Sequence, residues 1–176
     1  PESERLAIKE DLRVKVKPGD KGRYSVDYTT TIQTPLEGGI LLDDYRYGGG
    51  IGFRATEDWG DDNSTILTSE GHDRKTADGT EAKWIIVQGA SKAKEGKSGI
   101  LFLSHNTNKV NPEPLRVWPV GQYEGKGNVF IEFCPIRHES WELLKDENYT
   151  LKYRMIVYDG MLSAAEAEAY WKAFVK

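Results

Sequence analysis

The feature that most constrains this fold is a succession of short apolar segments, each followed by a turn. Residues 12–17 alternate apolar and charged side chains and end at Pro18-Gly19, and residues 23–33 alternate again. A period of two, with enrichment in Val, Ile, Tyr, Phe and Thr, is typical of β-strands. About ten strands are predicted on this basis, at residues 12–17, 23–33, 40–47, 50–55, 65–68, 83–88, 99–104, 116–120, 128–134 and 149–158.

Only the C-terminal segment has good helical periodicity. Ser163 is a suitable N-cap, and Glu166 follows it at the spacing of a capping box. Apolar side chains then recur at helical spacing, at Ala167, Tyr170, Trp171 and Phe174. Many strands, one helix and no alternation of strand with helix favour an all-β fold, an antiparallel β-sandwich with one C-terminal α-helix. The 176 residues fit a single domain, residues 1–176.

Composition and charge argue against several partners. The net charge is −4, whereas nucleic-acid-binding domains are more often basic, so no nucleic-acid partner is predicted. No apolar run approaches the roughly 20 residues that span a bilayer, so no membrane partner is predicted. The single cysteine, Cys134, lies in an apolar run and is expected to be a small buried side chain.

The start of the chain bears on its origin. The sequence begins at Pro1 without an initiator methionine and enters strand-like sequence almost at once. We therefore expect a mature product or a fragment of a longer protein. A periplasmic or secreted location would follow if a leader had been removed, and the compartment is otherwise open. The oligomeric state is open as well.

Residues 47–54, Tyr-Gly-Gly-Gly-Ile-Gly-Phe-Arg, form a glycine run that ends at Arg54. A nucleotide-binding loop would need a helix after the glycines, and a strand is predicted there instead. Two interpretations stay open: a bulge or tight bend that needs glycine, and a close approach of the backbone to a ligand. Arg54 favours the ligand slightly, because a cation at the end of an apolar strand needs a carboxylate, a ligand oxygen or solvent.

Two polar loops supply candidate acid–base groups. Residues 69–72, Ser-Glu-Gly-His, follow a strand, and the alternatives are a solvated turn and proton transfer by Glu70 or His72. His105 ends another apolar strand, and Asn108 nearby is suited to binding hydroxyl groups. A structural role for this histidine is the competing interpretation.

Aromatic and basic residues form a further candidate set. Trp84, Arg116, Trp118 and Tyr123 are of the types that stack on and clamp a sugar, and core packing is the equal alternative. The three histidines are far apart in the sequence and no H-x-H or H-E-x-x-H pattern occurs. No metal and no cofactor are predicted.

The order of these segments carries a resemblance. The glycine-rich strand is followed by the Ser-Glu-Gly turn, a Lys-Trp strand, a strand that ends at His105, and a Pro-x-x-Arg-x-Trp segment. Over roughly residues 20–176 this order resembles the C-terminal portion of the bacterial PmoA-like family, catalogued as "methane oxygenase PmoA". The resemblance implies a galactose-mutarotase-like supersandwich and, by association with polysaccharide-degrading genes, carbohydrate chemistry. The catalogued name does not suit this chain, which has no segment able to span a membrane.

The family pattern carries over to seven positions: Arg54, Glu70, Trp84, His105, Asn108, Arg116 and Trp118. Two segments depart from it. The family has a His-Pro-x-Asn loop where this chain has His105-Asn106-Thr107-Asn108, and an Arg-Trp pair where it has Lys83-Trp84. The loop at His105 is therefore expected to differ in shape, which leaves the role of Asn108 open.

The leading hypothesis is a carbohydrate-active protein that acts on or binds a sugar or sugar acid, or another polar small molecule, in a polar cleft. The glycine run and the Ser-Glu-Gly turn would belong to this one site, and Glu70 and His105 would be its proton-transfer pair. The predicted substrate-binding residues are Arg54, His72, Trp84, Asn108, Arg116 and Trp118. Alternatives are a non-catalytic carbohydrate-binding module and a structural interaction domain. Whether the chain is an enzyme stays open, as does the choice among epimerisation, glycosidic cleavage and elimination.

Overall fold

The computed structural model describes residues 4–92, 96–122, 124–125 and 127–176. These residues form twelve β-strands and one α-helix, and strands account for 44% of the chain. The strands are β1 (Lys9–Pro18), β2 (Tyr24–Gln33), β3 (Ile40–Leu42), β4 (Ile51–Arg54), β5 (Ser64–Thr68), β6 (Glu81–Ala82), β7 (Trp84–Ala90), β8 (Lys97–Ser104), β9 (Glu113–Val117), β10 (Phe130–Phe133), β11 (Trp141–Leu143) and β12 (Tyr149–Asp159). A short 3-10 helix (Asp20–Gly22) joins β1 to β2, and the α-helix is α1 (Ala164–Phe174).

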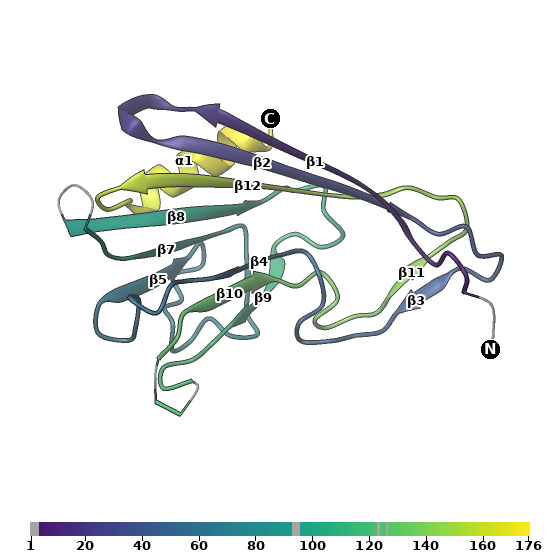
Figure 1. The fold of residues 1–176 in the computed structure, drawn as a ribbon, viewed down its shortest axis with the longest axis horizontal. Coiled ribbons are helices and arrows are strands. Elements are labelled where there is room, and N and C mark those ends of the chain that lie inside the picture. The colour runs from purple at the N-terminus through teal and green to yellow at the C-terminus, as the bar shows by residue number, and fades with distance from the viewer. Residues whose placement is uncertain (1–3, 93–95, 123, 126) are drawn as a thin grey trace.

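The strands form two main layers (Figure 1). The larger is a six-stranded antiparallel sheet in the order β1-β2-β12-β8-β7-β5, and the smaller is a four-stranded sheet in the order β4-β10-β9-β6. A two-stranded sheet of β11 and β3 lies at the end of the molecule where the chain begins. The prediction of an all-β antiparallel sandwich with a C-terminal helix is confirmed.

The core explains why the central strands are apolar on both faces. Ile85, Val87 and Phe102 of the six-stranded sheet pack on Leu115 and Ile131 of the four-stranded sheet. The alternate residues of β7 and β8 point the other way and form a second cluster with α1. Because both faces of these strands are covered, their sequence is continuously apolar instead of alternating.

Helix α1 begins as its sequence predicts. Ser163 accepts a hydrogen bond from the Glu166 backbone N–H, and the Glu166 side chain accepts one from the backbone of Ser163, which completes a capping box. Ala167 is fully buried in the second cluster. The residues that recur at helical spacing therefore form the face of α1 that packs on the sheet.

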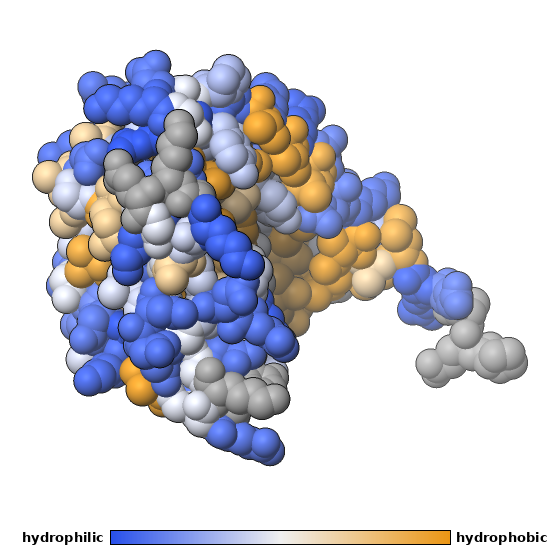
Figure 2. Space-filling view, turned by 60° about the vertical axis from the view of Figure 1, so that its left-hand side comes forward, coloured by the Kyte–Doolittle hydropathy of each residue, from blue (hydrophilic) through white to orange (hydrophobic). Residues whose placement is uncertain are grey.

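Strand β1 is an edge strand, and all of its residues are exposed. On β1, the exposed side chains of Leu12, Val14 and Val16 point to the side of the six-stranded sheet on which the four-stranded sheet lies, but they lie beyond that sheet. The residues between them are charged. Figure 2 shows hydrophobic surface toward the N-terminal end of the chain, beside a mostly hydrophilic face. Charged side chains and the terminal Pro18 limit pairing of this edge with other strands.

Several predicted boundaries are wrong in informative ways. The segment 40–47 was expected to be one strand, but β3 ends at Leu42 and a loop of residues 43–50 follows. Two aspartates follow Leu42, and their backbone leaves the ladder, so Asp44 N–H is hydrogen-bonded to the Asp43 side chain. Strand β9 begins at Glu113, earlier than the predicted residue 116, because Glu113 and Pro114 pair with the two-residue strand β6.

Candidate functional site

The glycine run lies beside a cleft of about 420 Å³ between the six-stranded sheet and the loop of residues 43–50. We call it the glycine cleft. Its lining includes Tyr28, Thr30, Tyr45, Tyr47, Gly49 and Trp141. The strands β1 and β2 provide one wall, the loop provides the other, and β11 closes one end. Aromatic rings therefore reach the cleft from three separate parts of the chain.

Different structural constraints apply to the glycines of this run. A Cβ on Gly50 would overlap with the carbonyl oxygen of Phe133, and one on Gly48 would overlap with the Ile136 side chain. Gly49 instead has open space around it, is exposed, and has a φ of +79°. Close packing thus explains Gly48 and Gly50, and the left-handed backbone at Gly49 favours glycine on conformational grounds.

The aromatic side chains of the loop are held by one another. The Tyr45 and Tyr47 ring centroids lie 5.8 Å apart, and Tyr45 remains 59% exposed. Trp141 of β11 also lines the cleft, and its ring meets Tyr149 edge-on at 5.4 Å. These rings present apolar faces that are partly open to solvent, which is the arrangement that binds the C–H faces of ring-shaped ligands.

Polar groups of the cleft come from β1 and β2. Thr30 Oγ1 donates a hydrogen bond to Glu10 Oε1 at 2.6 Å, and both residues line the cleft. Burial, together with the nearby Glu10 carboxylate, raises the pKa of Tyr28. A carboxylate, a hydroxyl and a phenol are thus available beside the aromatic faces, in a cleft whose lining is otherwise mostly apolar.

Behind Tyr47 the structure brings together three of the predicted site residues: Arg54, Arg116 and Trp118. Arg116 Nη2 and Trp118 Nε1 each donate a hydrogen bond of 3.1 Å to the Tyr47 hydroxyl. The Arg54 guanidinium lies 4.6 Å from the centre of the Trp118 ring. Burial raises the pKa of Tyr47, but these hydrogen bonds outweigh it and leave the pKa below its ordinary value. The cluster therefore fixes one wall of the glycine cleft.

The charge of Arg116 is balanced within this cluster. Its Nη1 donates to Asp78 Oδ2 at 2.7 Å, and Asp78 also accepts hydrogen bonds from Arg137 and from the Val117 backbone N–H. Arg116 is 6% exposed and Trp118 is 3% exposed. Neither side chain has a face that is free to stack on a ligand. Their position behind Tyr47 instead makes them supports of the cleft wall.

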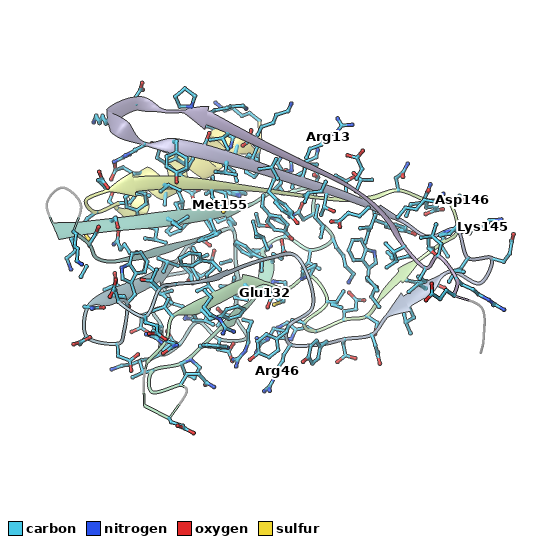
Figure 3. All side chains as sticks on the ribbon, in the orientation of Figure 1. Arg13, Arg46, Glu132, Lys145, Asp146 and Met155 are labelled. Carbon is cyan, nitrogen blue, oxygen red and sulfur yellow. The ribbon has the colours of Figure 1, made fainter. Side chains whose placement is uncertain are left out.

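Glu132 is an acidic residue of this region that sequence reasoning missed. It lies on β10 directly opposite Gly52 of β4 and Arg116 of β9, on the face that points away from the core (Figure 3). Burial raises its pKa to about 7, although the Cys134 thiol and Arg116 act in the opposite direction. A glutamate inside the apolar run 129–134 was the available indication, since a charge within such a strand requires a specific environment.

Trp84 and His105 lie on the other side of the six-stranded sheet. Trp84 is 3% exposed, and its indole N–H donates to Glu168 Oε2 of α1 at 2.9 Å. The His105 ring meets Phe174 of α1 edge-on at 5.0 Å. Burial, and then the positive charges of Lys152 and Arg154, lower the pKa of His105. The structure places Trp84 in the helix interface and His105 at its rim.

Asn108 belongs to a buried polar network. Its side chain binds the Lys152 backbone in both directions, donating to the carbonyl at 3.1 Å and accepting from the N–H at 2.8 Å. It also donates to Glu113 Oε2 at 3.2 Å. Tyr153 and Ser104 hydroxyls hydrogen-bond to the same carboxyl group. These contacts join the loop after β8 to β12 and to β9. The side-chain amide of Asn108 therefore has a structural role, because these hydrogen bonds occupy it.

Glu70 and His72 lie in the turn after β5. Ser69 donates to the Glu70 carboxylate at 3.1 Å, and the His72 backbone N–H donates to Thr68 Oγ1 at 3.0 Å. Within the residues that the structure describes, no hydrogen bond, ion pair or ring contact joins Glu70 to His105 or to the glycine run. The proposed proton-transfer pair therefore stays a prediction. Tyr123 lies outside the described residues.

Two kinds of feature are absent from the described part of the chain. No group of three or more His, Cys, Asp and Glu side chains there is placed to hold a metal ion. None of its helices is long and apolar enough to cross a membrane.

Comparison with known proteins gives one match. The model of a family of unknown function, DUF6807, matches residues 1–172. No curated protein and no solved structure matches the chain significantly.

Proposed function

We propose that this chain, which belongs to DUF6807, a family of unknown function, binds a sugar or sugar acid in the glycine cleft. The observation that carries this proposal is the meeting of partly open aromatic rings with a carboxylate and a hydroxyl in one cavity of about 420 Å³. Ligand pockets commonly measure roughly 300–1,000 Å³. The cavity suits one or two sugar rings.

The chemistry of a pyranose matches this lining. Its C–H faces pack on aromatic rings, and here Tyr45 and Trp141 both line the cleft. Its hydroxyls need acceptors, which Glu10 and Thr30 supply, and donors, of which the Tyr28 phenol is one, because the Thr30 hydroxyl proton is already donated to Glu10. Backbone near Gly49 is exposed without a side chain, so a ligand can approach it closely. The resemblance to PmoA-like proteins and to galactose-mutarotase-like supersandwiches points to the same ligand class.

In this proposal Arg116 and Trp118 contribute to ligand binding indirectly, through Tyr47. Arg116 and Trp118 hold the tyrosine hydroxyl, so that its ring keeps the orientation of the cleft wall. Arg54 is exposed and has no carboxylate partner among the described residues, which leaves its charge for a sugar acid that extends past the loop. A binding module fits these contacts best. Catalysis by Glu70 and His105 is the alternative.

Binding can be measured by titrating the chain with a panel of neutral and acidic mono- and disaccharides in a calorimeter. Tyr45→Ala removes the most exposed ring and should weaken binding at least tenfold while the fold is retained. The matched control is Tyr24→Ala, which removes another exposed tyrosine that does not line the cleft. Failure of every sugar to bind, or equal affinity of the Tyr45→Ala and wild-type chains, would rule the proposal out.

The catalytic alternative needs a separate measurement. The wild-type chain is incubated with each sugar that binds, and products are followed by NMR. Turnover that is lost in Glu70→Gln and His105→Ala, without a change in sugar affinity, would favour the enzyme. Binding with no product, in wild type and both variants, favours the module.

A further inference from the structure

A second concave surface lies on the face of β1, β2 and β12 opposite to the glycine cleft. It is a groove of about 360 Å³ bordered by these strands and by the end of α1. Residues alternate between the two faces along each strand, so Tyr28 lines the glycine cleft whereas Thr29 lines this groove. The two cavities therefore share a sheet but cannot share a small ligand. We call the second one the basic groove.

The strand register builds the groove from two rows of side chains. In the first row Lys15 of β1, Asp27 of β2 and Arg154 of β12 lie side by side. In the second row Arg13, Thr29 and Lys152 occupy the same three strands. Figure 3 shows Arg13 projecting from β1 on the side away from the four-stranded sheet. The second row places a hydroxyl between two cations and contains no acid.

Positive charge in the groove exceeds negative charge, in a chain whose net charge is −4. Asp27 is the one carboxylate among the described lining residues, and it is already paired with Lys17 at 2.7 Å and with Arg154. Arg13 is paired with Asp11 at 3.2 Å, in a contact that is largely exposed. No ion pair joins Lys15 or Lys152 to a carboxylate in the part of the chain that the structure describes. Two lysines thus face the groove with unbalanced charge.

The rim adds groups that recognise more than charge. His105 borders the groove next to Phe174, and its ring Nδ1 lies 2.8 Å from the Thr107 hydroxyl. Burial and the neighbouring cations lower the pKa of His105, and because its Nδ1 accepts a hydrogen bond from the Thr107 backbone N–H, the neutral ring presents its Nε2–H as a donor to a hydroxyl. The Phe174 ring offers an apolar edge. A bare inorganic ion would use the lysines alone, whereas a sugar bearing an anion would use the rim as well.

We infer that the basic groove binds an anionic sugar, whose carboxylate or phosphate lies over Thr29 between Lys15 and Lys152 and whose hydroxylated ring reaches His105. Both anions offer oxygens that accept hydrogen bonds from ammonium groups and from the threonine hydroxyl. The groove is separate from the glycine cleft, so this inference does not depend on the proposed function.

Binding is tested with four probes on the intact chain: glucuronate, glucose 6-phosphate, inorganic phosphate and glucose. Affinities are measured by calorimetry at low salt, because exposed charge pairs are screened as ionic strength rises. The expected result is that one or both anionic sugars bind at least tenfold more tightly than glucose and inorganic phosphate. The more tightly bound of the two identifies the preferred anion.

The variant that tests the location is the double substitution Lys15→Gln and Lys152→Gln, which should weaken binding of the anionic sugar at least tenfold. Lys9→Gln is the matched control, since Lys9 lies on the same face of β1 about 20 Å from Lys15, six residues away at about 3.3 Å each. The same comparison is made in the Tyr45→Ala chain, so that a sugar bound in the glycine cleft does not contribute, and the two lysine substitutions should cause the same loss there.

The His105 imidazole signals provide a local readout by NMR, with His72 and His138 as internal references. They should shift on addition of the anionic sugar, while those of the other two histidines stay in place. The inference is overturned by equal binding to the double variant and wild type, by phosphate binding as tightly as both anionic sugars, or by a short single-stranded DNA displacing them.

Discussion

Replacing the buried carboxyl group of Glu113 should remove a large part of the pH dependence of stability. Glu113 is fully buried, and burial raises its pKa to about 7 from an ordinary value of 4.5, even though Ser104, Tyr153 and Asn108 hydrogen-bond to it. The folded chain therefore holds a proton on Glu113 at pH values where the unfolded chain has released it. One pKa unit corresponds to about 1.4 kcal/mol, so the difference is worth about 3 kcal/mol in free energy of unfolding.

The sign of this pH dependence is set by whether the folded or the unfolded state binds more protons. Below about pH 4.5 both states are protonated and this group leaves the free energy of unfolding unaffected. Between about pH 4.5 and 7 the folded state binds one more proton than the unfolded state, so stability falls as pH rises. Above about pH 7 both states are ionised, and the full loss of about 3 kcal/mol is present.

Glu113→Gln keeps the shape of the side chain but cannot ionise. Its amide can still accept from the Tyr153 hydroxyl and donate to Ser104, although Asn108 loses one acceptor. We expect the stability of the variant relative to wild type to rise by about 3 kcal/mol from pH 4 to pH 8. Urea unfolding followed by tryptophan fluorescence measures this difference, with Glu57→Gln, an exposed glutamate, as the control. Parallel pH profiles of wild type and Glu113→Gln would refute the reasoning.

Three further substitutions test individual contacts by the same unfolding assay. Gly50→Ala should destabilise the chain by about 2 kcal/mol or more, because its φ is +82° and the new methyl group would overlap with the carbonyl oxygen of Phe133; an unchanged midpoint would show that the loop can shift. Arg74→Met should cost about 3 kcal/mol, since the buried guanidinium donates to three backbone carbonyls, and a loss below about 1 kcal/mol would contradict this. Trp84→Phe should cost about 2 kcal/mol by removing the indole hydrogen bond to Glu168, and a simultaneous Glu168→Ala change should then add little.

The strands that could be predicted from the sequence are those with a local pattern. Alternation identified β1 and β2, although every residue of β1 is exposed. The continuous apolar runs identified β7 and β8, where burial on both faces dictates residue type along most of the strand. Strands β6 and β11 are two and three residues long, too short to show any period. They form because partners distant in the sequence, β9 and β3, present an edge.

The candidate site was predictable only in part, for a similar reason. Arg54, Arg116 and Trp118 were selected for their residue types, and they do lie together behind Tyr47. Their convergence depends on the register of β4, β10 and β9, which no local pattern encodes. Trp141 was not selected, because an isolated tryptophan carries no indication of whether it packs in the core or lines a cleft.

Two glutamates, Glu113 and Glu132, look alike in the sequence but lie in different environments in the structure. Each is a glutamate in a largely apolar strand, and burial raises the pKa of each to about 7. The first receives hydrogen bonds from the side chains of Ser104 and Asn108, which precede it closely in the chain, and of Tyr153, which is distant. The second lies on the outward face of β10 opposite Gly52, where there is no side chain. The sequence indicates that both need a specific environment, but only the paired strands decide that one completes the core and the other lies half-buried on the outward face of β10.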